Sequence, residues 1–214
     1  MKRSNIGKAL VYHSFSREYS PVLGNQKLLE EIGKYKNLYP CWVLFPHYTG
    51  EMPVPEELIN VILEKGIRAV RIFPKTHKWS LSEWSAGVLL KILEKRSIPL
   101  FIDFEETNFD QLNSVCSGHP NLPVVLTRAP FRLNRDIYAL LSETSNLYID
   151  TSFFQLYYGI EDVCEKFGAN RLLFGSATPF FDPAPLIMVV KYARISKEEK
   201  AMIAGGNLMQ LLGF

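Results

Sequence analysis

Residues 168–214, GANRLLFGSATPFFDPAPLIMVVKYARISKEEKAMIAGGNLMQLLGF, decide the fold of this chain. The stretch opens with a short apolar run, residues 171–176 (RLLFGS), which is typical of a buried β-strand. Prolines then stop and start the segments that follow, and Ser196 with Glu199 three residues later forms a capping-box pattern for a helix. A strand followed by helices is the unit from which parallel α/β sheets are built.

The same pattern repeats along the chain towards the N-terminus. Longer segments with helical periodicity separate the runs, and the runs themselves are continuously apolar, as expected of strands buried on both faces. We therefore predict an α/β fold of parallel strands. Seven runs are recognised: 8–12 (KALVY), 41–45 (CWVLF), 68–73 (RAVRIF), 99–104 (PLFIDF), 122–127 (LPVVLT), 147–151 (LYIDT) and 171–176. Ser80 and Glu83 form a second capping-box pattern, for a helix running to about Arg96.

Length and composition favour one globular domain over residues 1–214. The chain has 214 residues, 47% of them hydrophobic and 21% charged, near the short limit of roughly 200–250 residues for an eight-stranded α/β barrel. The 24 basic and 22 acidic side chains are spread out, giving a net charge of +2. Without a basic stripe, we do not expect nucleic acid as a partner.

Three cysteines and the lack of long apolar runs bear on localisation. Cys41, Cys116 and Cys164 are odd in number and widely separated, which favours buried, reduced thiols over disulfides or a metal site. No window reaches the roughly 18 apolar residues of a membrane span, and the N-terminus has no secretory signal pattern. We expect a soluble, cytoplasmic protein that does not engage a membrane.

Several phrases resemble the amidohydrolase superfamily, in particular a group described only as amidohydrolase-related. They are ALVYHS (9–14), CWVLFPHYTGEMP (41–53), VRIFPKTH (70–77), NLPVVLTR (121–128) and the terminal GGN (205–207). The resemblance implies a TIM-barrel-like (β/α) barrel. It also implies that the chain begins at the family's second strand, so that seven parallel strands are recognisable and the family's first strand, which carries a His-x-His pair, is missing.

A barrel without its first strand would have unpaired backbone groups on the edges of two strands, and these edges can pair with another segment. We consider two explanations for the missing strand: a reading frame that begins downstream of the true start, or a barrel that lacks one strand. In the second case a homodimer formed across the gap is a hypothesis.

The resemblance also implies where metal ligands would stand. Family members usually hold zinc or a similar ion with the first-strand histidines, histidines after the fifth and sixth strands and an aspartate after the eighth. The matching positions here hold Asp103, then Thr127 or Arg128, then Ala177. We therefore assign no metal ligands; the cofactor is unknown, and a divalent metal such as zinc is not supported by these positions.

Residues that follow the strands are the candidates for chemistry, because in this fold the loops after the strands form the active-site face. We predict His13, Asp103 and Arg128 as catalytic. Asp103 interrupts an apolar run, where a carboxylate is costly unless paired, so it is either a site residue or an ion-pair partner, for instance of Arg128. A histidine after a strand can equally be a loop or capping residue. Substrate-binding candidates are His47, Lys75, His77, Glu105, Asp150, Ser152 and Ser176.

Two functions remain open from the sequence. The first is a hydrolase of a small carboxylated or cyclic substrate with a non-standard site at the strand ends, where an imidazole beside a carboxylate could transfer protons without metal. The alternative is a catalytically degenerate barrel that serves as a binding or regulatory subunit. Either way, the expected partner is a small molecule.

Overall fold

The computed structural model describes residues 1–214, with the exception of the Lys2 side chain. Eight short strands are all parallel to their neighbours, in the orders β1-β2 and β3-β4-β5-β6-β7-β8. Each of the seven predicted runs contains one strand, and β2 lies just before β3. The strands are β1 (Ala9–Val11), β2 (Leu38–Pro40), β3 (Trp42–Leu44), β4 (Val70–Ile72), β5 (Leu100–Asp103), β6 (Val124–Thr127), β7 (Leu147–Asp150) and β8 (Leu172–Leu173).

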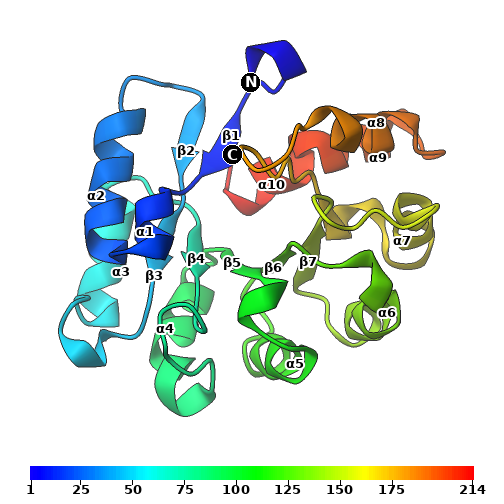
Figure 1. The fold of residues 1–214 in the computed structure, drawn as a ribbon. Coiled ribbons are helices and arrows are strands. Elements are labelled where there is room, and N and C mark those ends of the chain that lie inside the picture. The colour runs from blue at the N-terminus through cyan, green and yellow to red at the C-terminus, as the bar shows by residue number, and fades with distance from the viewer.

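Helices surround this curved set of strands on the outside (Figure 1). They are α1 (Ser14–Glu18), α2 (Pro21–Ile32), α3 (Pro55–Glu64), α4 (Glu83–Lys95), α5 (Phe109–Gly118), α6 (Asn134–Glu143), α7 (Gly159–Phe167), α8 (Ala184–Tyr192), α9 (Lys197–Ala201) and α10 (Asn207–Leu211). A π-helical turn, η6 (Met202–Gly206), joins α9 to α10. Short 3-10 turns complete the connections: η1 (Lys2–Ser4), η2 (His47–Thr49), η3 (Phe104–Glu106), η4 (Phe131–Leu133) and η5 (Ala169–Arg171).

The two predicted capping boxes had different outcomes. At α9 the prediction is confirmed, because Ser196 and Glu199 exchange side-chain and backbone hydrogen bonds. At α4 it is wrong, since the N-cap is Ser82, and the Ser80 hydroxyl donates to the Ser82 hydroxyl. Glu83 instead lies 3.2 Å from Nε2 of the buried His119, whose Nδ1 lies 3.2 Å from Glu94.

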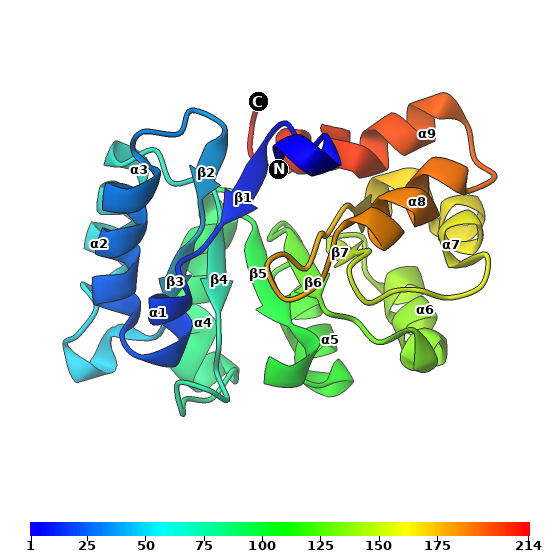
Figure 2. The ribbon, with the colours of Figure 1, turned by 45° about the horizontal axis from the view of Figure 1, so that its top comes forward.

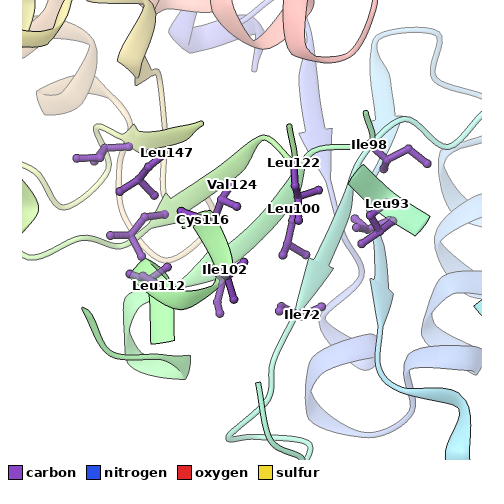
Figure 3. Close-up of a cluster of buried hydrophobic side chains, with 14 of the residues drawn as sticks. Ile72, Leu93, Ile98, Leu100, Ile102, Leu112, Cys116, Leu122, Val124 and Leu147 are labelled. Atoms are coloured by element: carbon purple, nitrogen blue, oxygen red, sulfur yellow. The ribbon is translucent and has the colours of Figure 1, made fainter. Parts of the chain in front are cut away.

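Strand residues alternate between two buried layers, as the pleat requires. Residues facing outwards, such as Ile72, Leu100, Ile102 and Val124, pack against the helices in one large core (Figure 3). Residues facing inwards form a smaller cluster of Cys41, Ala69, Phe101, Val125, Leu173 and Leu212. All three cysteines are buried and free, as predicted.

The strand formed by β2 and β3 changes partner at Cys41. Its first half pairs with β1, and its second half pairs with β4. Beyond the end of β1, the backbone of Val43 is satisfied by Asn25 of α2, whose side-chain amide accepts from Val43 N and donates to Val43 O, both at 2.9 Å. A buried side-chain amide thus replaces the hydrogen bonds of a neighbouring strand.

The C-terminal helices return to the start of the chain (Figure 2). Asn207 is buried, and its Nδ2 donates to Ala169 O at 2.8 Å and Leu172 O at 2.7 Å, which ties α10 to the start of β8. The GGN motif is therefore structural. Leu212 enters the inner cluster, and its carbonyl accepts from Arg68 at 2.9 Å, so that the chain end covers the N-terminal end of the sheet.

β1 and β8 form the two ends of the strand series, and no pairing joins them among the described residues. The edge of β8 is partly covered, because Phe174 N, just beyond the strand, donates to Ile203 O at 2.9 Å. The fold is a (β/α) barrel with a gap between β1 and β8.

Candidate active site

A cavity of about 850 Å³ opens at the C-terminal ends of the strands. Inward-facing residues near the C-terminal ends of the strands form the polar wall of the cavity. On each strand, they lie two positions after a residue of the apolar inner cluster and so face the same side. These polar residues are Tyr12, Arg71, Asp103, Thr127 and Asp150. Of the ten predicted site residues, Asp103, Arg128, Asp150, Ser152 and Ser176 line the cavity.

Asp103 is held in a buried network with Arg71 and Thr127. Its Oδ1 accepts hydrogen bonds from the Arg71 guanidinium and from the Thr127 hydroxyl. Asp103 is only 2% exposed, so the ion pair compensates a carboxylate that would otherwise be very costly to bury. Burial is the largest single effect and lowers the pKa of Arg71, but the neighbouring acidic groups, Asp103 foremost, together outweigh it and raise the pKa, so the guanidinium stays charged.

The ion pair suggested between Asp103 and Arg128 is therefore a wrong prediction. On the neighbouring strands β4 and β5, Arg71 pairs with Phe101, so Asp103 lies two residues further along β5. The side chains of Arg71 and Asp103 both face inwards. Arg128 follows β6 with a left-handed backbone (φ 57°) and lies 3.6 Å from Glu105.

Arg128 spans the cavity wall beside an aromatic ring. Its guanidinium lies 4.8 Å from the centre of the Phe153 ring. The buried Nε atom of Arg128 has no hydrogen-bond partner among the described residues, and the same holds for Nε of Arg71. Both arginines line the cavity, and the positive charge of their guanidinium groups suits an anionic ligand.

Asp150 carries the most perturbed carboxyl group of the site. Its Oδ1 accepts hydrogen bonds from the Ser152 hydroxyl at 2.7 Å, from Ser152 N at 3.3 Å and from Arg128 N at 3.2 Å. No described residue donates to its Oδ2. Burial raises the pKa of Asp150 to about 6, although Ser152, Arg71 and Arg128 act in the opposite direction.

Gly175 makes room for this carboxylate. A Cβ atom at Gly175 would lie 2.3 Å from Oδ2 of Asp150, so only glycine lets the segment after β8 pass this close. Cys41 also lines the cavity, but burial raises the pKa of its thiol to about 12, which keeps it protonated at neutral pH.

The other predicted residues lie outside the cavity lining. His13 is the N-cap of α1, where its Nδ1 accepts from Phe15 N at 3.0 Å, and its Nε2 lies 3.5 Å from Glu31. His77 lies 3.0 Å from the Arg17 carbonyl, and the Lys75 ammonium donates to Thr107 O at 3.0 Å. The ring of His47 packs against that of Tyr48. Glu105 contacts the cavity lining through its ion pair with Arg128. The structure thus gives the histidines local capping and packing contacts.

The residues present do not fit the metal centre that the resemblance implies. No group of three or more His, Cys, Asp or Glu side chains that could hold a metal ion occurs among the described residues. Asp103, the one acidic residue at a ligand position, is engaged by Arg71, and Ala177 has no donor atom. The cavity lining places the guanidinium of Arg71 together with the carboxylates of Asp103 and Asp150, where the family would hold a metal ion.

Sequence reasoning missed Arg71, Tyr12 and Gly175 as site residues. The sequence does carry one signal for Arg71: it lies between two apolar residues of a strand, Val70 and Ile72, so it must face the opposite side from them. Which side is the barrel interior follows only from the curvature of the sheet. Nothing local in the sequence marks Gly175 as a neighbour of Asp150.

Fold and site together define the class of protein, a (β/α) barrel with a polar cavity at the C-terminal ends of its strands. Within this class the chain belongs to the amidohydrolase family, whose model matches residues 26–214. None of the curated protein sequences matches the chain. No described helix is long and apolar enough to cross a membrane.

Several solved structures share the fold of this chain. An uncharacterised TIM-barrel protein from Bordetella bronchiseptica has a TM-score of 0.77 at 21% identity, over 99% of this chain and 79% of that one. A 5-carboxyvanillate decarboxylase from Novosphingobium aromaticivorans, solved with manganese and a nitrobenzoic acid, has a TM-score of 0.76 at 14% identity, over 99% and 77%. A 2,6-dihydroxybenzoate decarboxylase from Rhizobium has a TM-score of 0.72 at 14% identity, over 99% and 85%. These likenesses show the fold.

Proposed function

We propose that the protein is an enzyme that hydrolyses an amide, ester or lactone bond in a small carboxylated substrate, with Asp150 as the proton-transferring group. The observation that carries the proposal is the state of Asp150. One oxygen is fixed by three hydrogen bonds, the other has no donor among the described residues, and burial brings the pKa to about 6. A carboxyl group tuned towards neutral pH inside a cavity is the usual signature of a general acid–base residue.

The charges of the cavity support an anionic substrate. Arg128 and Arg71 both line the cavity, and a guanidinium can hold a carboxylate through two parallel hydrogen bonds. Arg128 is the better candidate for the carboxylate, because Arg71 is already engaged with Asp103 and Thr127. Arg71 would then place positive charge near the oxygen on which negative charge develops.

In this proposal Asp150 Oδ2 accepts a proton from a water molecule, and the water oxygen forms a bond to the substrate carbonyl carbon. Collapse of the tetrahedral intermediate breaks the bond to the leaving nitrogen or oxygen, which takes the proton back from Asp150. The carboxyl group ends the cycle ionised, as it began. No step needs a metal, for which the site offers no ligand set.

The experiment is a turnover screen with Asp150→Asn and a matched exposed control, Asp110→Asn. The panel holds amides, esters and lactones that carry a carboxylate, with separate detection of hydrolysis product and of released CO2. We expect hydrolysis whose kcat/KM rises with pH through about 6, as Asp150 ionises. Asp150→Asn should lower kcat by about 10²–10⁴-fold, whereas the Asp110→Asn protein should behave like the wild type.

Other outcomes would redirect the proposal. The structurally similar decarboxylases act on carboxylated aromatic rings, so release of CO2 without hydrolysis would keep the site and refute the reaction. Tight binding of a carboxylate without turnover of any compound would favour a binding or regulatory subunit. Unchanged kcat in the Asp150→Asn protein would refute the role of Asp150.

A further inference from the structure

Tyr12 is a polar residue of the cavity lining that the proposed function leaves without a role. It directly follows β1 and packs, half-buried, against the inner apolar cluster, so its side chain faces the barrel interior. The centre of its ring lies 5.0 Å from Cζ of Arg71 and 5.6 Å from the centre of the Phe73 ring. Both partners belong to β4 or follow it directly, so the ring is held from the side of β1 that faces β3 and β4.

The phenol of Tyr12 lies among charged groups. Burial is the largest effect and raises the pKa of Tyr12 above its ordinary value of about 10. The charge of Asp103 acts in the same direction, and the charges of Arg71, Arg17 and Arg128 act against it. The phenol therefore keeps its proton at neutral pH, so it is available as a hydrogen-bond donor.

Arg71 connects this phenol to the proton-transferring carboxyl group. The guanidinium lies over the Tyr12 ring, and the charge of Asp150 raises the pKa of Arg71 as well. Tyr12 and Asp150 are thus both neighbours of the guanidinium that is proposed to face the developing negative charge. Fixed donors aimed at such a charge are usually the largest single contribution to catalysis of acyl transfer.

We propose that Tyr12 is a further catalytic residue, whose hydroxyl donates a hydrogen bond to the substrate carbonyl oxygen as negative charge develops on it. This role rests on the proposed function and adds a second donor beside Arg71. When the water oxygen bonds to the carbonyl carbon, the π pair of the C=O bond moves onto the oxygen that Tyr12 contacts. The pair returns when the bond to the leaving atom breaks and that atom takes the proton from Asp150. Tyr12 keeps its own proton throughout.

The first test is the kinetics of Tyr12→Phe, which keeps the ring against Arg71 and Phe73 and loses only the hydroxyl. We expect kcat to fall about 10²–10³-fold, as for the loss of one such donor elsewhere. KM should change less than about twofold, because the hydrogen bond strengthens only in the transition state. Tyr35→Phe, at an exposed position after α2, is the matched control and should behave like the wild type.

A second variant, Tyr12→Leu, separates the hydroxyl from the ring. If Tyr12→Phe keeps the kcat of the wild type and only Tyr12→Leu loses activity, the ring merely positions Arg71 and the proposal is refuted. Thermal unfolding confirms that each variant is folded.

The second test measures binding and needs no turnover. Phosphonoacetate, which carries a carboxylate and a tetrahedral oxyanion, is titrated by calorimetry into the wild type, Tyr12→Phe and Tyr35→Phe. Malonate, with two planar carboxylates, is the reference ligand. Loss of the hydroxyl should weaken phosphonoacetate about tenfold or more, since hydrogen bonds to charged groups are the strong ones. Malonate should be affected less, and Tyr35→Phe should bind both ligands like the wild type.

The outcomes distinguish this proposal from the proposed function. If the wild type hydrolyses its substrate and Tyr12→Phe is equally active, Tyr12 is not catalytic and the hydrolase stands. If nothing is hydrolysed but Tyr12→Phe binds phosphonoacetate selectively more weakly, the hydroxyl contacts the oxyanion and the proposed reaction is wrong. If nothing is hydrolysed and neither ligand distinguishes Tyr12→Phe from the wild type, both proposals are refuted.

Discussion

At the scale of single residues, the site depends on two carboxylates in different surroundings, the buried Asp103 and the half-buried Asp150. Asp103 is neutralised by Arg71 and has a structural role. Asp150 shares the same inward-facing layer but is held by hydroxyl and backbone donors only. Burial raises the pKa of the Asp150 carboxyl to about 6, close to neutral pH.

The raised pKa of Asp150 predicts a pH-dependent stability. The carboxyl of an unfolded chain has a pKa of about 3.9, and that of folded Asp150 is about 6. Between these values the folded protein binds a proton that the unfolded chain has lost, so this group's contribution to stability falls as pH rises from about 4 to about 6. The stability of the wild type relative to Asp150→Asn should therefore fall by at most about 3 kcal/mol over that window.

Urea unfolding of both proteins at several pH values measures this difference. The Asp110→Asn protein serves as the control, and its stability should run parallel to that of the wild type. A wild-type-to-Asp150→Asn difference that does not change between pH 4 and 7 would contradict the raised pKa.

Gly175 predicts a second effect at this scale. In Gly175→Ala the new methyl group would lie 2.3 Å from Oδ2 of Asp150, so the carboxylate or the segment must move. We expect kcat to fall at least about tenfold, because small misplacements of a catalytic group have large effects on rate. The control is Gly118→Ala, where a Cβ meets nothing within 4 Å. Equal activity of the two variants would speak against the proposed position of the reacting oxygen.

At the scale of elements, the C-terminal helices are placed by polar anchors as much as by apolar packing. Asn207 connects α10 to the segment that leads into β8, and no equivalent connection is visible from the GGN motif alone. Element ends were also the least predictable feature. Ser196 caps its helix as expected, whereas Glu83 near Ser80 contacts His119 because tertiary structure offers it that partner.

Loss of the Asn207 anchor should destabilise the whole domain. Asn207→Ala would leave the carbonyl of Leu172 without a donor, which costs about 1–3 kcal/mol for a buried group left unpaired. The carbonyl of Ala169 keeps its hydrogen bond from Leu172 N. Asn37→Ala removes a single exposed hydrogen bond to Gly7 O (3.2 Å) and should cost less than about 1 kcal/mol. Chemical denaturation compares them, and equal losses would show that the anchor does not hold α10.

At the scale of the whole molecule, the central strands are better covered than β1, which lies at one end of the strand series. The residues of β5 and β6 are all buried, and each of these strands pairs on both sides, whereas β1 is half-buried and pairs with β2 only. Stability should therefore be lowest along the free edge, since local opening needs few contacts to be broken there.

Hydrogen exchange should show this difference directly. We expect the amides of β1 to exchange at least about tenfold faster than those of β5 and β6 in the free protein. Uniform protection across all strands of the free protein would mean that another element covers the edge.

The sequence by itself determined the seven strands, the parallel α/β class and the strand-end position of Asp103, Arg128 and Asp150. Those features follow from local apolar runs and from the rule that loops after the strands form one face. Tertiary structure alone decided that Arg71 pairs with Asp103, that the histidines cap and pack outside the cavity, and that Gly175 passes beside Asp150. The pairing of Arg71 with Asp103 and the approach of Gly175 to Asp150 depend on strand register and sheet curvature, which bring together residues far apart in the sequence and leave no local pattern in the chain.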